Sequence, residues 1–486
     1  MRCTLWQPLS PCGLLHGAAK GRALSPDPPC DGWTGTDRGT GQQAEGFDLR
    51  IAMIGGGYVG LVSAACFADL GVEVAVVEVD KAKLGALREG RIPIYEPGLD
   101  RLVAENVTAG RLSFGDDLPA AVQNAEAVFI AVGTPTRRGD GHADVSYVLA
   151  AAEQVARALT HYAVVVTKST VPVGTGRRIA ELLRRTRPDL EIDVASNPEF
   201  LREGSAIGDF MRPDRVVIGT ESERAQEVLR RLYRPLYLNE SPILFTGIET
   251  AELTKYAANS FLAMKITFIN EMADLCERVG ADVHDVARGI GLDGRIGRKF
   301  LHPGPGFGGS CFPKDTLALM RIAQDWGAPS RLVEATVTVN DARKSSMSAR
   351  IVQACGGSVL GKTIAVLGLT FKPETDDMRD APSLPIVSRL VEQGAAIRAF
   401  DPVGMEQARP MLPEGVIYCR DAYDALSGAD ALVVVTEWNE FRALSPARIK
   451  DEMRGDVVVD LRNVFDPAAM AQAGLKYRGI GRRASV

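Results

Sequence analysis

Short apolar runs alternate with longer amphipathic segments over most of this chain. Between Leu49 and Thr246, five of the apolar runs have the length of strands. These runs are Ile51–Ile54, Val74–Val77, Ala127–Val132, Val164–Lys168 and Ile192–Ala195. The segments between them are long enough for helices, among them Leu61–Leu70. The alternation therefore predicts βαβ units and a parallel sheet.

A second set of strand-like runs begins near Lys362 and consists of Ile364–Leu367, Ile397–Phe400, Ala431–Val435 and Val457–Val459. Between the two sets, the pattern predicts a long helix from about Glu249 to Val279. Side chains three or four residues apart form a stripe along it: Leu253, Tyr256, Ser260, Met264, Phe268, Met272, Leu275 and Val279. Such a stripe is typical of a helix that faces a core or a second subunit.

We therefore expect an α/β protein in which two Rossmann-like domains are joined by a long central helix and a helical connector. The expected domains are residues 49–246, 247–345 and 346–486. Residues 1–48 are rich in Gly, Pro, Ser and Asp and show neither a helical nor a strand period. We expect them to be disordered, or to precede a true start of translation near Leu49.

The composition narrows the possible functions. Of the 486 residues, 46% are hydrophobic and 24% are charged, the net charge is −5, and no block of five basic residues occurs. That argues against a nucleic-acid or membrane-surface partner. No apolar run reaches the roughly 18–20 residues of a membrane span, and the start does not resemble a signal peptide. Eight cysteines without a CxxC pair indicate reduced thiols and a cytoplasmic protein.

The segment Gly55–Gly60 fits the pattern GxGxxG, and it follows a predicted strand and opens a predicted helix. In that context the glycines permit a tight turn and a close approach to a pyrophosphate at the helix N-terminus. Glu78 ends the next predicted strand about 20 residues later, where an acid would bond ribose hydroxyls and favour NAD over NADP. The alternative is a glycine-rich turn without a ligand.

A second segment, Gly356–Thr363, fits the P-loop pattern but lacks its context. A P-loop follows a strand and opens a helix. Here a helical segment (346–354) comes first and a strand (364–367) follows, so no helix N-terminus would face a phosphate. We therefore do not expect ATP to bind there.

The segment Pro303–Asp315, PGPGFGGSCFPKD, carries the most chemical information. Glycines precede Cys311, and Pro313 stands where the first turn of a helix would be. Cys311 is therefore expected at a helix N-terminus, where the helix dipole favours the nucleophilic thiolate. Asp315, four residues later, shares the same helix face. The alternative is a buried cysteine beside a capped helix.

Two further pairs have suggestive spacing. Lys255 and Asn259 are four residues apart on the long helix, so both could point at one oxyanion. Glu199 and Glu203 follow a strand end, where open α/β sheets bind ligands, and one of them could be a general base. Each pair could instead belong to a solvated helix face. The five histidines do not pair at ligand spacing, so no metal is expected.

Together these motifs resemble those of the UDP-glucose/GDP-mannose dehydrogenase family, from Leu49 to about Asp466. The matching segments include IGGGYVG, KSTVPVGT, SNPEFLREG, ELTKYAANSFLA, GPGFGGSCFPKD and GLTFKPETDD. The resemblance implies an NAD-binding domain, a central helix that forms a homodimer, and a C-terminal domain that helps to bind the UDP part of a nucleotide sugar.

The implied reaction is a four-electron oxidation of UDP-glucose, the substrate that FGGSCFPKD fits best, at its 6-hydroxymethyl group. Cys311 would capture the aldehyde as a thiohemiacetal, and the second oxidation would give a thioester that water cleaves. By the same resemblance, Lys255 and Asn259 steady the oxyanions. Asp315 assists proton removal through a water near Thr170, and Glu199 activates water for hydrolysis.

The resemblance also implies two sets of binding residues. The NAD ligands would be Gly55, Gly57, Tyr58, Val59, Glu78, Lys83, Thr134, Thr170 and Glu203. The substrate contacts would be Glu199, Phe200, Leu201, Lys255, Asn259, Arg295, Phe307, Gly308, Phe371, Lys372 and Arg462. Glu203 would also position Lys255 or a water, and Arg295 would reach in from the partner subunit.

Two alternatives remain at this point. One is a related dehydrogenase for GDP-mannose or a UDP-amino sugar, because the choice of base and sugar depends on a few pocket contacts. The other is a non-catalytic nucleotide-binding protein on the same fold. The joint presence of Cys311, Lys255 and Asp315 argues against the second.

Overall fold

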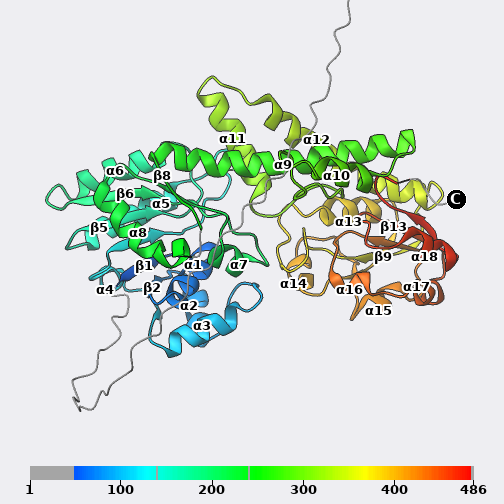
Figure 1. Ribbon diagram of the computed structural model, residues 1–486. Helices are drawn as coiled ribbons and strands as arrows, with labels where there is room; N and C mark the ends of the chain where they lie inside the picture. The colour runs from blue at the N-terminus through cyan, green and yellow to red at the C-terminus, as the bar shows by residue number, and fades with distance from the viewer. Residues whose placement is uncertain (1–48, 138, 140, 239–240, 483–486) are drawn as a thin grey trace, which may run out of the picture. The chain divides into compact units, whose positions relative to one another are not determined.

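The computed structural model describes residues 49–482 except 138, 140, 239 and 240 (Figure 1). The predicted extension, residues 1–48, lies outside this range. The first sheet has eight strands in the order β3-β2-β1-β4-β5-β6-β7-β8. They are β1 (Arg50–Ile54), β2 (Glu73–Val77), β3 (Leu112–Gly115), β4 (Ala127–Ile130), β5 (Ala163–Thr167), β6 (Ile192–Ser196), β7 (Val216–Gly219) and β8 (Ile243–Thr246). Strands β1 to β6 are parallel, as predicted, and only the single pair Ser196–Gly219 joins β6 to an antiparallel β7.

Helices cover both faces of this sheet, which explains why its central strands are almost continuously apolar. They are α1 (Tyr58–Asp69), α2 (Lys81–Arg88), α3 (Leu99–Thr108), α4 (Leu118–Val122), α5 (Ser146–Ala158), α6 (Thr175–Thr186), α7 (Ala206–Met211) and α8 (Glu223–Leu238). One core contains Phe67 of α1 and Tyr233 of α8. The other contains Val148 of α5 and Ile179 of α6. The sheet is thus the middle layer of three.

The second sheet repeats this topology. Its order is β11-β10-β9-β12-β13-β14, and every pair is parallel. The strands are β9 (Thr363–Leu367), β10 (Ala396–Phe400), β11 (Ile417–Tyr418), β12 (Ala431–Val434), β13 (Val457–Asp460) and β14 (Lys476–Arg478). Its helices are α13 (Ser383–Glu392), α14 (Met405–Ala408), α15 (Ala422–Leu426), α16 (Asn439–Arg442), α17 (Pro446–Glu452) and α18 (Pro467–Gln472). The expected α/β class with two Rossmann-like sheets is confirmed.

Four helices lie between the two sheets in sequence: α9 (Ile248–Val279), α10 (Val283–Gly291), α11 (Phe312–Asp325) and α12 (Arg331–Ala354). Figure 1 shows α9 as one long helix, which ends at Gly280 in the left-handed conformation. The residues of the predicted stripe divide between two apolar faces of α9. One, with Tyr256 and Ile269, is buried. The other is exposed and consists of Leu253, Phe261, Phe268, Leu275 and Val279.

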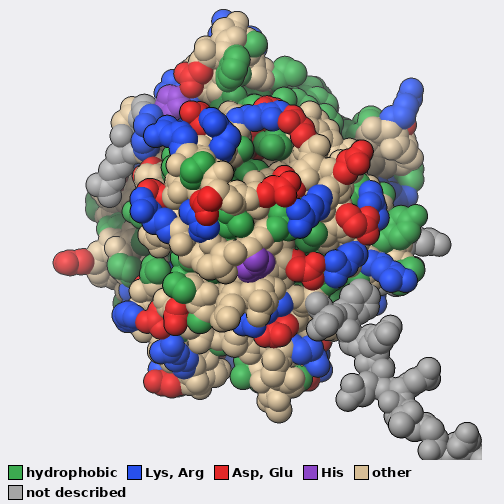
Figure 2. Space-filling model, turned by 90° about the vertical axis from the view of Figure 1, so that its left-hand side faces the viewer, with side chains coloured by type: hydrophobic (Ala, Val, Ile, Leu, Met, Phe, Trp, Pro, Cys, Tyr) green, Lys and Arg blue, Asp and Glu red, His purple; other side chains and the backbone are tan. Residues whose placement is uncertain are grey.

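On the face in Figure 2, Lys and Arg side chains are interspersed with Asp and Glu. The segment Gly356–Thr363 follows α12 and leads into β9, so it lacks the strand-to-helix context of a P-loop. Across the described part of the chain, no helix has the length and apolar character needed to span a membrane.

Candidate active site

The turn from β1 into α1 is shaped for a phosphate. Gly55 has a φ of +106°, and a Cβ there would lie 2.7 Å from the carbonyl oxygen of Ala131. A Cβ on Gly60 would lie 2.0 Å from the carbonyl oxygen of Gly55, so both positions require glycine. Gly57 precedes the first turn of α1 without a side-chain cap, and no atom lies within 4 Å of its Cβ position. No side-chain cap satisfies the first N–H groups of α1, which leaves them available to the pyrophosphate of a dinucleotide.

Neighbouring strand ends supply the rest of this dinucleotide crevice. Glu78 is buried at the end of β2, and its carboxylate accepts hydrogen bonds from the backbone N–H of Gly56 (3.0 Å) and of Asp80 (2.9 Å). The hydroxyl of Thr134, after β4, donates to the carbonyl oxygen of Thr170, after β5 (2.9 Å). These loops lie beside β1 and β4, where the strand order reverses and open α/β sheets bind ligands. Val59 lies in the first turn of α1, and Lys83 is exposed on α2.

The cysteine loop is held in place by close backbone packing. A Cβ on Gly308 would lie 2.4 Å from the carbonyl oxygen of Asp380. Gly309 has a φ of +85°, and its Cβ would lie 2.7 Å from the ring of Phe371. The loop therefore fits against the C-terminal sheet domain only with glycine at these positions. It delivers Cys311 to the N-cap of α11, as the sequence predicts.

Burial and charge act in opposite directions on Cys311. Burial raises the pKa of this thiol above its ordinary value, and the neighbouring Lys255 ammonium opposes that rise. The nearby carboxylates of Glu199 and Asp315 raise the pKa further, whereas Ser310, whose hydroxyl lies 3.5 Å from the sulfur, lowers it. The pKa of Cys311 is therefore raised despite its place at a helix N-terminus, and Lys255 is the larger of the two effects that favour ionisation.

Lys255 and Asn259 point from one face of α9 into this buried cluster. Lys255 Nζ is 3.1 Å from Glu199 Oε1, with both side chains almost fully buried. Burial would lower the pKa of Lys255, but Glu199, Cys311 and Asp315 together outweigh it and raise that pKa. Asn259 donates to Asp315 Oδ2 at 2.6 Å. The alternative of a solvated helix face is therefore wrong for these residues.

Glu203 lies on the other side of the cysteine. It accepts a hydrogen bond from Ser310 (2.9 Å) and one from Thr375 (3.2 Å), and it lies 3.5 Å from the Arg379 guanidinium. Burial, with the carboxylate of Asp377 beside it, raises the pKa of Glu203. The expectation was that Glu203 positions Lys255 or a water; the Lys255 ammonium bonds to Glu199 instead, and the role toward a water stays a prediction.

The expected substrate residues fall into three places. Phe200 and Leu201 follow Glu199, whose carboxylate accepts the Leu201 N–H at 2.5 Å. Around the cysteine loop lie Phe307, Gly308, Phe371, Lys372 and Arg462. Arg462 donates to the carbonyl oxygens of Val435 (2.8 Å) and Phe371 (3.1 Å). Arg295 is exposed and pairs with Asp293 at 2.6 Å, and among the described residues no hydrogen bond joins it to another of the expected substrate residues.

Several residues of this site were not predicted from the sequence. Ser310 and Lys314 flank Cys311, and Lys314 Nζ is 2.6 Å from Asp315 Oδ1. Their place in the SCFPKD segment was the signal that could have identified them. Glu96 bonds to the Tyr58 hydroxyl and accepts the Gly204 N–H (2.7 Å), linking the dinucleotide turn to the Glu199–Glu203 loop. No spacing in the sequence indicated that link.

The similarity to known proteins covers all parts of this site. Residues 49–237 match the NAD binding domain, residues 249–342 the central domain and residues 365–467 the UDP binding domain of the UDP-glucose/GDP-mannose dehydrogenase family. UDP-glucose 6-dehydrogenase of Rhizobium meliloti (strain 1021) is 60% identical over 436 residues, which cover 89% of this chain and 100% of that protein.

Solved structures agree with this match. A UDP-glucose dehydrogenase from Pyrobaculum islandicum has a TM-score of 0.83 at 40% identity, covering 91% of this chain and 100% of that one. The UDP-D-ManNAc dehydrogenase from Pyrococcus horikoshii has a TM-score of 0.77 at 28% identity, covering 89% and 99%. The chain therefore belongs to the UDP-glucose/GDP-mannose dehydrogenase family.

Proposed function

We propose that this protein is an NAD-dependent UDP-glucose 6-dehydrogenase, which oxidises UDP-glucose to UDP-glucuronate. The observation that carries the proposal is the buried cluster in which Lys255, Asp315 and Glu199 surround the thiol of Cys311. A cysteine nucleophile beside an ammonium, with carboxylates nearby, suits covalent capture of an aldehyde. The relatives named UDP-glucose dehydrogenase, at 60% and 40% identity, support UDP-glucose as the substrate.

The turn at Gly55–Gly60 and the acid Glu78 would hold NAD, with Thr134, Thr170, Glu203, Lys83, Tyr58 and Val59 around it. Bound NAD supplies the acceptor for one hydride in each oxidation, and a fresh NAD serves the second. In the first oxidation Asp315 takes the hydroxyl proton through a water near Thr170. Lys255 and Asn259 donate hydrogen bonds to the oxygen on C6 as its charge develops.

Cys311 then adds to the aldehyde. The bond from sulfur to C6 forms, the C6 oxygen takes a proton, and the product is a thiohemiacetal, which can lose a second hydride. That loss, together with the hydroxyl proton, gives a thioester. Glu199 activates the water whose oxygen bonds to C6 as the bond to sulfur breaks. In sum, two hydrides leave, one water enters, three protons are released, and the thiol is restored.

The same proposal includes a homodimer. The exposed apolar face of α9, defined above, is large for a surface in water, and Leu292 and Ile296 beside Arg295 are exposed as well. A second copy of α9 would cover these side chains. Arg295, whose side chain is exposed, would then contact the substrate of the partner subunit.

We also propose a cytoplasmic location, because the described cysteines, Cys66, Cys276, Cys311, Cys355 and Cys419, are all free thiols. A nucleophilic cysteine needs a reducing compartment.

The experiment that tests the substrate is the NADH yield from a limiting nucleotide sugar with excess NAD. The proposal predicts about two NADH for each UDP-glucose and none from GDP-mannose or UDP-N-acetylmannosamine. A full yield from one of the latter sugars alone would keep the mechanism but replace the substrate. About one NADH per sugar would mean that oxidation stops at the aldehyde, and no NADH from any sugar would favour a non-catalytic protein.

A further inference from the structure

Lys168, which directly follows β5, is a buried ammonium whose hydrogen-bond partners in the described part of the chain are both uncharged. It is 4% exposed. It donates to the side-chain oxygen of Asn197 (3.0 Å) and to the Tyr233 hydroxyl (3.3 Å), and within the described residues no acid bonds to it. A charge in such a place is costly unless something compensates it.

Asn197, which accepts a hydrogen bond from Lys168, fixes the backbone directly after β6. The side-chain oxygen of Asn197 accepts from both Lys168 and Tyr233, and its amide donates to the carbonyl oxygen of Val217 (2.8 Å). This amide therefore bridges β6 to β7 just where the backbone ladder between them is reduced to one pair. Pro198 follows, with a fixed φ, and then Glu199. The position of Glu199 thus depends on how Asn197 is held.

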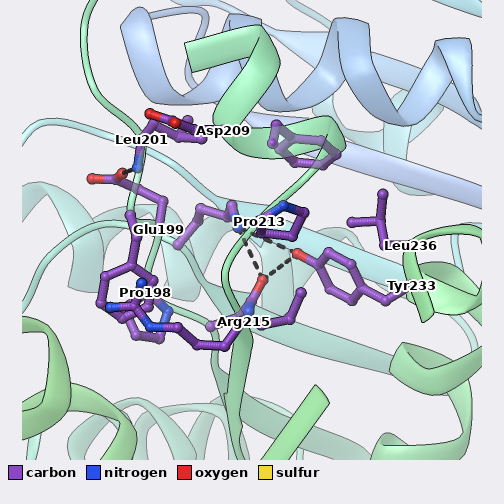
Figure 3. Close-up of a pocket in the computed structure, with 13 residues that line it drawn as sticks. Pro198, Glu199, Leu201, Asp209, Pro213, Arg215, Tyr233 and Leu236 are labelled. Carbon is purple, nitrogen blue, oxygen red and sulfur yellow. Dashed lines mark hydrogen bonds between the residues drawn. The ribbon is translucent and has the colours of Figure 1, made fainter. Parts of the chain in front are cut away.

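Lys168 and Glu199 also share a cavity. Figure 3 shows Glu199 and Tyr233 on its wall, and Lys168, Phe210 and Arg215 line it as well. The rings of Phe210 and Tyr233 lie 5.9 Å from the ammonium and compensate part of its lost hydration. Burial lowers the pKa of Lys168 to about 8, and the Glu199 carboxylate is the largest effect that opposes this decrease. The two side chains therefore interact through space as well as through Asn197.

We propose that Lys168 is a positioning residue for product release. It holds Asn197 and attracts Glu199, and so places the Glu199 carboxylate next to the water that cleaves the thioester. The inference rests on the proposed role of Glu199. A neutral donor could hold Asn197 without the cost of a buried charge. The positive charge of Lys168 therefore acts by attracting the carboxylate of Glu199, which lines the same cavity. Lys255 binds the same carboxylate from the opposite helix, α9.

Rapid mixing of enzyme with UDP-glucose and excess NAD separates oxidation from hydrolysis. Hydrolysis that is slower than both oxidations gives a burst of about two NADH per site, followed by a slow steady state. Glu199→Gln is expected to show this burst. Lys168→Gln keeps a donor for Asn197 but removes the charge. We expect this variant to show the burst at the wild-type rate of oxidation and a steady-state rate about tenfold lower than that of the wild type. Tyr233→Phe removes one bond to Asn197 but no charge, and should slow it less.

Lys168→Arg separates the role of the charge from a purely structural role, since the adjoining cavity offers room for the larger side chain. Arginine should recover most of the steady-state rate that glutamine loses. In the wild type, the steady-state rate should fall as the pH rises through about 8, because burial lowers the pKa of Lys168 to about 8 and the ammonium loses its proton there. That change should be absent in Lys168→Arg, because a guanidinium stays protonated.

Two results would overturn the inference. If Lys168→Gln slows the burst as much as the steady state, or changes only thermal stability or KM, Lys168 merely supports the fold. If Glu199→Gln itself shows no burst, the proposed role of Glu199 fails and the inference fails with it. A burst in Glu199→Gln without one in Lys168→Gln would contradict the inference alone.

Discussion

Asn259 donates a 2.6 Å hydrogen bond to the carboxylate of Asp315 and so joins the central helix α9 to the helix that begins at the active-site cysteine. Both side chains are buried, and Lys314 binds the other carboxylate oxygen. The amide therefore fixes the acid next to Cys311. It also leaves one of its own N–H groups for the C6 oxygen of a substrate.

Replacing Asn259 with alanine should lower kcat by roughly 10²–10³-fold, the usual effect of removing one oxyanion donor. The effect on KM should be small, because this bond matters most when charge develops. Steady-state kinetics measure both constants. Thr254→Ala is the control, since the Thr254 hydroxyl bonds to the carbonyl oxygen of Thr250 in its own helix. Equal kcat values for the two variants would contradict the role of Asn259.

The cysteine loop should tolerate no side chain at Gly309. Alanine there would have to adopt a φ of +85° and would overlap the Phe371 ring. We expect Gly309→Ala to shift Cys311 and to lower kcat about 100-fold, because a displacement near 1 Å is enough for such a loss. Gly327→Ala is the matched control, with a φ of +67° but no atom within 4 Å of the Cβ. It should cost only about 1–2 kcal/mol of backbone strain and keep its activity. Two equally active variants would show that the close packing does not position the cysteine.

Glu252 of α9 should make stability depend on pH. Its carboxylate accepts the N–H groups of Gly174 and Gly176 at 2.7 Å each and so caps α6, but burial raises its pKa to about 7. The folded protein therefore holds a proton that the unfolded chain releases above about pH 4.5. The stability from this proton is complete below that pH and is lost as the pH rises through about 7.

Glu252→Gln cannot ionise, so its unfolding free energy relative to the wild type should rise by on the order of 2 kcal/mol from about pH 5 to about pH 7.5. Urea unfolding at the two pH values measures this difference. Glu249→Gln, on the same helix, is the control. Arg177 lowers the pKa of Glu249, so that variant should not gain stability as the pH rises. A constant difference between Glu252→Gln and the wild type would mean that Glu252 is ionised throughout.

The proposed homodimer predicts complementation between two inactive chains. Cys311→Ala lacks the nucleophile, and Arg295→Ala lacks the residue that we expect to act across the interface. Unfolded together and refolded, they should regain about a quarter of wild-type activity, because half of the dimers are mixed and each has one complete site. A mixture that stays inactive would indicate that Arg295 acts within its own chain, or not at all.

The sequence predicted the central strands of both sheets better than their edges. Buried runs such as Val164–Thr167 have an unmistakable apolar character. The edge strands β3, β8, β11 and β14 were not predicted, and they are short and partly exposed. The inner strand β7 was not predicted either, although all four of its residues are buried. On α9, spacing alone could not separate the buried face from the exposed one, because a repeat of three and four residues drifts around a helix of 32 residues.

The residues of the site were predictable, but their pairing was not. Spacing placed Lys255 and Asn259 on one helix face, and the structure brings both to the cysteine. Whether Lys255 meets Glu199 or Glu203 depends on the turn of the loop that carries both carboxylates. No pattern in the sequence gives that turn. For Lys168 the sequence predicted only that it ends a strand. Its hydrogen bonds could not be predicted, because its partners Asn197 and Tyr233 are 29 and 65 residues away.

The covalent role of Cys311 is tested most directly by mass spectrometry of Glu199→Gln, quenched in acid during turnover of UDP-glucose with NAD. If Cys311 carries the thioester, the peptide that contains it should gain the mass of a UDP-glucuronyl group, and hydroxylamine should remove that mass. An unmodified Cys311 peptide, in a sample that has formed about two NADH per site, would contradict the account.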